Sequence, residues 1–460
     1  MRHDLLVIGS GPAGVSAALQ GAKLGLDVAL VERAFMLGGA CVHQGTIPSK
    51  TLRETILRIM AMRRAGKMGI HSTYLRELSM ADLLASKDAV IQAQVDTLQS
   101  FLERNQIHVL PGSGSFVSPN EVRVATSHGE RIVAAEHVIL ATGSRPRRPD
   151  NVPFDDNLVM DSDSILSMNR IPRSLAILGA GVIGCEYACM MAALGVKVSL
   201  IDRRDRVLRF LDDDVLDGLH FRMRRMGVRM LLSEAMDSVR VEGSGETARA
   251  VVRLKSGRVV KAHRLLMAAG RESNTASLNL GAVGIETDET GLVKVDEDYR
   301  TTTPNISAVG DVIGFPALAG TGMHQGRVAV LSMAGKPAPS AENLPIAIYT
   351  IPEISMVGLT EQEARDKGLP YEVGVARYSE VARGQILGDD EGLLKLVFRR
   401  DDRKLLGVHL LGQNSAELVH MGMAVLHAGG TIDALADSVF NHPTLSEAYR
   451  VAALDGLNRL

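Results

Sequence analysis

The sequence is poor in cysteine and has no excess of charge of either sign. Three cysteines among 460 residues are too few for a secreted disulfide framework, so we expect a reducing, cytoplasmic environment. The net charge is −2, from 51 basic and 53 acidic residues, which argues against binding to nucleic acid or to an anionic membrane. No apolar run approaches the ~18 residues of a membrane span. A strand predicted directly after Met1 leaves no room for a signal peptide.

Metal-binding templates are missing as well, because the sequence has neither C-x-x-C nor H-E-x-x-H. We therefore expect no metal site.

The length corresponds to about three domains of ~150 residues each. With 46% hydrophobic and 23% charged residues, the composition is typical of a globular protein. These limits favour a multidomain cytoplasmic enzyme.

What the chain does contain is an internal repeat, with an offset of 170 residues. Each copy has a short apolar run, three glycines in the pattern G-x-G-x-x-G, a helix-like segment, a second apolar run and an acid. The copies consist of Gly9, Gly11, Gly14 and Glu32, and of Gly179, Gly181, Gly184 and Asp202. Two such units in strand–turn–helix context, each with its acid, are a far stronger signal than one glycine-rich turn.

The spacing suits the binding of a dinucleotide. The first glycine permits a tight turn, the second lets a pyrophosphate approach the backbone, and the third lets the helix pack on the strand. The N-terminus of that helix offers unpaired N–H groups to the phosphates, and the acid accepts hydrogen bonds from a ribose. The alternative is two glycine turns without a ligand. The sequence predicts an α/β fold with two Rossmann-like dinucleotide-binding domains.

Three further apolar runs end in glycine or in an acid. Val138–Gly143 and Leu265–Gly270 repeat each other as buried strands, and Ile306–Asp311 is a third. We expect Gly143 and Gly270 to lie near the dinucleotides. The Asp311 carboxylate has two interpretations: it binds a polyol such as the ribityl chain of a flavin, or it caps the following helix.

Together these motifs resemble the flavoprotein family of glutathione reductase and dihydrolipoamide dehydrogenase, over the whole chain. The resemblance implies that FAD binds to residues 1–150 and 271–335, and NAD(P) to an inserted domain of residues 151–270. It also implies a C-terminal α+β dimerisation domain of residues 336–460, hence a homodimer, with larger assemblies left open. Glu32 would then hold the FAD ribose and Asp311 the ribityl chain.

One departure from this family decides the expected chemistry. Its disulfide reductases carry two cysteines separated by four residues beside the flavin, whereas here Cys41 is followed by Thr46. A hydroxyl cannot form a disulfide, so the relay from flavin to dithiol is absent. Cys185 and Cys189 lie four apart on a predicted helix, where packing is their expected role. The segment Gly45–Lys50 resembles that of soluble, Si-specific pyridine nucleotide transhydrogenases.

The second glycine unit carries both an acid and arginines that bear on cofactor choice. Asp202 would bind the ribose 2′-hydroxyl of NAD, while Arg203 and Arg209 stand where NADP-preferring relatives carry arginines. A site with both groups could accept both nucleotides. The alternative is a solvated charge run with surface ion pairs.

The resemblance also assigns residues beside the flavin. Lys50 would stabilise negative charge on the reduced ring, Glu186 would pair with Lys50, and Gly39 would contact the cofactor. His442 and Glu447 match the acid–base loop of the disulfide reductases. Because a transhydrogenase moves only a hydride, that pair is either a structural remnant or catalytic.

The expected function is FAD-dependent, reversible hydride transfer between NADPH and NAD⁺ by a ping-pong mechanism. Two alternatives remain open. One is a dihydrolipoamide-dehydrogenase-like or diaphorase-type enzyme that uses Cys41 and His442, and the other is a non-catalytic flavoprotein that senses redox state.

Overall fold

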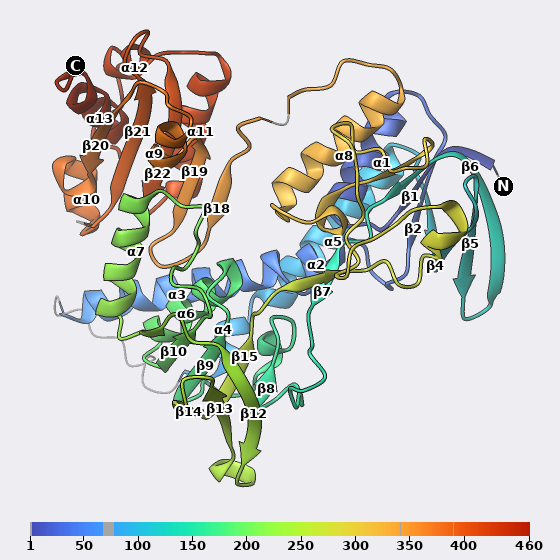
Figure 1. The fold of residues 1–460 in the computed structure, drawn as a ribbon, viewed down its shortest axis with the longest axis horizontal. Coiled ribbons are helices and arrows are strands. Elements are labelled where there is room, and N and C mark those ends of the chain that lie inside the picture. Colours follow the sequence, from blue (N-terminus) through green and yellow to red (C-terminus); the bar gives the residue numbers. More distant parts are fainter. Residues whose placement is uncertain (1, 68–77, 341, 390) are drawn as a thin grey trace. The chain divides into compact units, whose positions relative to one another are not determined.

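The computed structural model describes residues 2–67, 78–340, 342–389 and 391–460, which form two compact units (Figure 1). The first unit combines Met1–Pro149, Asp161–Arg170 and Gly270–Ala341. The second combines Asp150–Met160, Ile171–Ala269 and Glu342–Leu460. The chain therefore leaves the first unit and returns to it. The second unit contains residues of both the expected NAD(P) domain and the expected dimerisation domain.

The first unit is built on a seven-stranded sheet in the order β3-β2-β1-β6-β5-β4, with β17 also paired to β6. The neighbours β3, β2, β1, β6 and β17 run parallel, and β4 to β6 form antiparallel hairpins. The strands are β1 (Arg2–Ile8), β2 (Val28–Glu32), β3 (His108–Pro111), β4 (Ser113–Ser118), β5 (Glu121–Thr126), β6 (Gly129–Leu140) and β17 (Ile306–Ala308). The continuous apolar runs of β1 and β2 follow from this position, because a central parallel strand is buried on both faces.

Helices and a small two-stranded sheet complete this unit. The two-stranded sheet pairs β7 (Ser144–Pro146) with β16 (Arg271–Ser273). The helices are α1 (Pro12–Lys23), α2 (Gly39–His43), α3 (Thr46–Lys67), α4 (Met80–Leu84), α5 (Lys87–Arg104) and α8 (Ala319–Met333). α1 and α8 lie side by side, since Gly326 of α8 leaves no room for a side chain against the Ala13 backbone (Figure 1).

The second unit contains a five-stranded parallel sheet in the order β11-β10-β9-β15-β8. Its strands are β8 (Val159–Met160), β9 (Ser174–Leu178), β10 (Lys197–Ile201), β11 (Arg229–Leu231) and β15 (Arg264–Met267). Two helices follow β9 and β10, namely α6 (Val182–Ala193) and α7 (Asp213–Arg225). A three-stranded antiparallel sheet joins β12 (Met236–Glu242), β13 (Arg249–Leu254) and β14 (Val259–Ala262).

The C-terminal part of the second unit is an antiparallel sheet in the order β18-β19-β22-β21-β20. The strands are β18 (Ile346–Ile348), β19 (Ile354–Gly358), β20 (Tyr371–Arg377), β21 (Leu393–Arg399) and β22 (Leu405–Leu411). The helices are α9 (Glu361–Asp366), α10 (Ala382–Leu387), α11 (Ser415–His427), α12 (Ile432–Ala436) and α13 (Glu447–Leu457). A buried apolar core joins this sheet to α11, α12 and α13. Among the described residues, no helix has both the length and the hydropathy of a bilayer span.

A buried lysine links α7 to this antiparallel sheet. Lys395 of β21 is 1% exposed, and its Nζ lies 2.9 Å from Asp212, 2.7 Å from Asp214 and 2.7 Å from Glu361. Asp212 also accepts the backbone N–H of Asp214 at the start of α7. Burial alone would lower the pKa of Lys395, but its three carboxylate partners raise it. The lysine is therefore charged, and its neighbours depend on that charge.

We expect Lys395→Met to lower the free energy of unfolding by about 3–5 kcal/mol at neutral pH, because it leaves the buried carboxylate of Asp212 and the partly buried one of Glu361 without their cation. Burial raises the pKa values of Asp212 and Glu361, but the hydrogen bonds and charge of Lys395, with His409 acting on Asp212, hold them below normal. This stabilisation is present above the unfolded pKa values of about 4 and is lost as the pH falls through the lower folded values. The difference in the free energy of unfolding between wild type and the Lys395→Met variant should therefore shrink below about pH 4.

Denaturant unfolding at several pH values measures this difference. Lys404→Met is the matched control, because Lys404 is exposed and lies 3.7 Å from a single acid, Asp402. That control should change stability by less than about 0.5 kcal/mol. Equal effects of the two substitutions would contradict the assigned role of Lys395.

Candidate dinucleotide sites

The first glycine unit forms a tight turn between β1 and α1. Gly9 has φ +109°, and a side chain on it would overlap the carbonyl group of Ala141. A side chain on Gly14 would overlap the carbonyl oxygen of Gly9, so the helix can approach the turn only with glycine there. At Gly11, by contrast, an added Cβ would meet no atom within 4 Å. The first and third glycines are thus required by the fold, and the second faces open space.

The second glycine unit repeats this geometry between β9 and α6. Gly179 has φ +107° and lies against the carbonyl group of Ala268, and Gly184 lies against the carbonyl oxygen of Gly179. An added Cβ at Gly181 would again meet nothing within 4 Å. Neither α1 nor α6 has a side-chain cap or an acid in its first turn. Both helix N-termini therefore offer N–H groups to an anion.

Each unit ends in a carboxylate that is already held by the chain. Glu32 is buried at the end of β2, where Oε2 accepts hydrogen bonds from the Ser10 backbone and hydroxyl, and Oε1 accepts one from Ala34. A carboxylate has about four acceptor positions. Three of those of Glu32 are used, which leaves one for a ribose hydroxyl.

Asp202 follows β10 and is held more completely. Its Oδ1 accepts the backbone N–H and the Nε of Arg204 at 2.8 and 2.9 Å. Its Oδ2 accepts from Ala180 N at 2.6 Å and from Arg204 Nη2 at 2.8 Å. Burial alone would raise the pKa of Asp202, but these hydrogen bonds and the Arg204 charge lower it. The four acceptor positions are filled, and a ribose hydroxyl must displace one donor.

The neighbouring arginines differ in their partners. Arg209 forms an exposed ion pair with Asp205 at 2.6 Å. Arg203 is exposed and has no side-chain partner among the described residues. An exposed pair contributes at most about 1 kcal/mol, so Arg209 can exchange Asp205 for another anion at small cost.

The Cys41 segment lies against the first glycine unit. Gly39 has φ +58°, and an added Cβ would lie 3.0 Å from the Cα of Gly11. Cys41 is in α2, while Thr46 begins α3 and Lys50 lies one turn further on. Burial, aided by the charge of Asp311, raises the pKa of Cys41, while the Thr46 hydroxyl and the charge of Lys50 act in the opposite direction. Cys41, Thr46, Lys50 and Asp311 thus belong to one site.

Asp311 is positioned by two residues that sequence reasoning missed. Its Oδ2 accepts the Ser144 hydroxyl at 2.7 Å. Arg271 in turn donates to the Ser144 hydroxyl and to the Ser144 carbonyl, and its Nε lies 3.9 Å from Asp311. Asp311 caps neither following helix: it lies inside the short 3₁₀ helix Gly310–Ile313, whose N-cap is Val309, and α8 begins after Leu318 without a side-chain cap. The interpretation of Asp311 as a helix cap is therefore wrong.

The remaining predicted residues are distributed over both units. Gly143 and Gly270 have φ +67° and +112° at the ends of their strands. Glu186 of α6 is buried, and its Oε1 accepts the backbone N–H of Tyr349 at 2.8 Å. Cys185 and Cys189, also on α6, are buried free thiols, in keeping with a packing role.

His442 and Glu447 form a pair in the second unit. Nδ1 of His442 lies 2.8 Å from Oε1 of Glu447, and Oε2 accepts the backbone N–H of Thr444. These two hydrogen bonds lower the pKa of Glu447. The His442 side chain is 69% exposed. The glutamate therefore orients an accessible imidazole.

Comparison with known proteins agrees with this geometry. Residues 3–326 match the sequence model of the pyridine nucleotide-disulphide oxidoreductases, and residues 344–453 match the dimerisation domain of the same proteins. The chain belongs to the pyridine nucleotide-disulphide oxidoreductase family. The predicted fold class, an α/β fold with a C-terminal α+β domain, is thereby confirmed.

Relatives in this family carry a more specific name. A soluble pyridine nucleotide transhydrogenase of Mycobacterium tuberculosis is 46% identical over 100% of this chain and 98% of its own. One of Colwellia psychrerythraea is 43% identical with the same coverage. Among solved structures, the HOCl-induced flavoprotein disulfide reductase RclA of Escherichia coli is 28% identical, with a TM-score of 0.85, over 98% of this chain and 99% of that one.

The first site fits the FAD that this family implies. Its glycine turn presents an open backbone at Gly11, Glu32 keeps one acceptor position, and Ser144 holds Asp311 where its charge acts on Cys41. Oγ1 of Thr142 is a buried polar atom with no hydrogen-bond partner among the described residues, and it lies in the loop that contacts Gly9. Such an atom is unfavourable unless a ligand or water pairs with it.

Ser10, Ser144, Arg204 and Arg271 were missed because their roles are indirect. Ser10 is the variable position between two motif glycines, and Arg204 stands inside a charge run. Ser144 directly follows the predicted Gly143, and Arg271 directly follows Gly270. For Ser10, Ser144 and Arg271, adjacency to a predicted glycine was the only available signal, and it does not say which side chain turns toward the site.

We expect Gly14→Ala to release FAD, because the added methyl group forces α1 away from the carbonyl of Gly9. The FAD content of the purified protein, read from flavin absorbance relative to protein absorbance, should fall at least tenfold. Gly281→Ala is the control, since Gly281 has no positive φ and no atom within 4 Å of an added Cβ. Full flavin content in the Gly14 variant would contradict the assignment.

Proposed function

We propose that this chain catalyses reversible hydride transfer between NADPH and NAD⁺, with FAD in the first glycine unit and the nicotinamide nucleotides entering the second in turn. The observation that carries the proposal is the pair of Cys41 and Thr46. Where a disulfide reductase needs two thiols, this chain has one thiol facing a hydroxyl. The names of the full-length relatives support the same activity.

The residues of the first unit would hold and polarise the flavin. The glycine turn formed by Gly9, Gly11 and Gly14 would let the pyrophosphate approach. Glu32 would bind the ribose, and Asp311 would bind the ribityl chain. Gly39 keeps the Cys41 segment close to Gly11. Bound FAD supplies a ring that accepts and returns a hydride, and the protein supplies orientation and the exclusion of water. The Lys50 ammonium would stabilise negative charge on the reduced ring. Glu186 is the partner proposed for Lys50.

The second unit has the chemistry to accept both nucleotides. Without a ligand, Arg204 neutralises Asp202, so a 2′-phosphate is not repelled by a free carboxylate. Arg203 and the weakly paired Arg209 can bind that phosphate. When NAD⁺ binds, its 2′-hydroxyl can take the place of one Arg204 donor on Asp202. If Asp202 alternates between Arg204 and the 2′-hydroxyl of NAD⁺ as its partner, one nucleotide site can serve both hydride-transfer steps.

The reaction is tested with NADPH as donor and thio-NAD⁺ as acceptor, beside lipoamide and oxidised glutathione. We expect rapid reduction of thio-NAD⁺ and no catalytic reduction of either disulfide. Anaerobic titration should show two electrons taken up per FAD, since Cys41 lacks a second thiol. Brisk reduction of a disulfide without reduction of thio-NAD⁺ would overturn the proposal.

Cofactor choice is tested by replacing Arg203 and Arg209 together with glutamine. Loss of two charge-assisted hydrogen bonds, each worth about 1.5 kcal/mol or more, should raise the Kd for NADP⁺ at least tenfold. The Kd for NAD⁺ should change by less than threefold. Arg206→Gln is the control, because Arg206 lies in the same loop as Arg203 and Arg209 but pairs with Asp213. If NADP⁺ binding is unchanged, the arginines are a surface charge run.

A second candidate function rests on the geometry of His442 and Glu447. The glutamate holds an exposed imidazole in the way a proton-transfer pair requires. This geometry favours an enzyme that works through Cys41 and His442. The disulfide substrates in the assay above distinguish it from a transhydrogenase, because only this second candidate would reduce them.

Three further properties remain predictions: a homodimer formed through residues 336–460, the other domain boundaries given above and a cytoplasmic location. The matching dimerisation domain supports the homodimer.

A further inference from the structure

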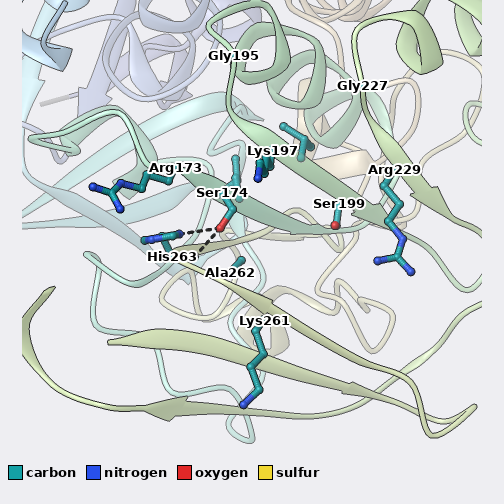
Figure 2. A pocket seen from close by; sticks show the side chains of 12 residues that line it. Arg173, Ser174, Gly195, Lys197, Ser199, Gly227, Arg229, Lys261, Ala262 and His263 are labelled. Atoms are coloured by element: carbon teal, nitrogen blue, oxygen red, sulfur yellow. Dashed lines mark hydrogen bonds between the residues drawn. The ribbon is translucent and has the colours of Figure 1, made fainter. Parts of the chain in front are cut away.

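A cavity of about 820 Å³ lies at the edge of the parallel sheet of the second unit where its strands begin (Figure 2). Ser174, Lys197 and Arg229 are the first residues of β9, β10 and β11. The register places Lys197 beside Ser174, and Arg229 beside Ser199. The glycine turn at Gly179 follows the other end of β9, five residues or about 17 Å away. The cavity is therefore separate from the nucleotide site.

Its lining is basic. Arg173, Lys197, Arg229, Lys261 and His263 contribute to it, and no acid is among the lining residues. In Figure 2, Ser174 and Ser199 lie between Arg173 on one side and Arg229 on the other. Lys261 pairs with Glu242. The side chains of Arg173, Lys197 and Arg229 have no partner among the described residues.

The ends of two helices cannot account for these cations. α6 and α7 end before Gly195 and Gly227, both of which line the cavity. A helix C-terminus carries roughly half a negative charge. Two ends together offset about one of the three unpaired cations.

Inside the cavity, the His263 imidazole lies against Ser174 and is affected by the charge of Arg173. His263 contacts the Ser174 hydroxyl through Nδ1 at 2.8 Å and through its backbone N–H at 3.1 Å. Burial lowers the pKa of His263, and the charges of Arg249, Arg173 and Arg264 lower it further. An anion placed here would meet an uncompensated positive charge and the Ser199 hydroxyl.

We propose that this cavity binds a small phosphorylated metabolite. Arginine and lysine pair with phosphate oxygens, and the hydroxyl of Ser199 can donate to them. The volume falls within the ~300–1,000 Å³ of clefts that hold small ligands. The chain as a whole has a net charge of −2, so the positive charge is local and suits a compact anion better than a polyanion.

The test measures binding of inorganic pyrophosphate by calorimetry to FAD-loaded protein saturated with NADP⁺, so that both glycine turns are occupied. We expect wild type to bind one pyrophosphate per chain, and binding to weaken as salt is raised. The variant with both Lys197→Gln and Arg229→Gln should bind at least tenfold more weakly. Both side chains are exposed and unpaired, so the fold should tolerate the change.

The matched control carries Arg253→Gln and Lys255→Gln. It removes two exposed, unpaired charges from the same unit but outside the cavity. Its affinity should stay within twofold of wild type. The proposal is overturned if wild type does not bind, if the cavity variant binds as wild type does, or if both variants lose affinity equally. It is also overturned if polyglutamate of ten residues binds more tightly than pyrophosphate. Because the readout is binding, its outcome does not depend on the reaction proposed above.

Discussion

The contact on which both dinucleotide sites depend is that of a glycine Cα against a glycine carbonyl. Gly14 lies against the Gly9 oxygen, and Gly184 lies against the Gly179 oxygen. This approach brings the N-terminus of α1 or α6 directly over the end of a parallel strand, where its free N–H groups face the turn. A Cβ at either position would displace the helix and with it the anion site. The same physical constraint, satisfied twice, explains why the two units repeat each other so closely.

The two units then diverge in the way their acids are held. Glu32 is bound by a serine and by backbone N–H groups, which are neutral donors and leave one acceptor position. Asp202 is bound by the Arg204 guanidinium, which fills two acceptor positions and cancels its charge, and by two backbone N–H groups that fill the other two. The first arrangement suits a ligand that stays bound, because nothing has to move. The second suits nucleotides that exchange, because a side chain can replace the ligand when it leaves.

Charge also organises the second unit away from the glycine turn. Lys395 is buried among three carboxylates and ties the start of α7 to the antiparallel sheet. Since α7 follows the loop that carries Arg203, Arg204 and Arg209, the sheet helps to position that loop. At the opposite edge of the parallel sheet the charges are of one sign, and Arg173, Lys197 and Arg229 have no side-chain partner among the described residues. The first arrangement stabilises the fold, while the second leaves exposed cations available to an anion.

The sequence by itself determined the two glycine units, their acids, the apolar strands before them and the replacement of a second cysteine by Thr46. These features are local, because a turn that needs glycine at three fixed positions leaves its spacing in the chain. Only the tertiary structure decided which side chains hold those acids. The contacts of Ser10 and Arg204 with these acids depend on side-chain rotamers. The path from Arg271 through Ser144 to Asp311 joins segments more than 100 residues apart. The Lys395 cluster and the basic cavity likewise join residues from separate strands and helices, and no periodicity along the chain predicts such contacts.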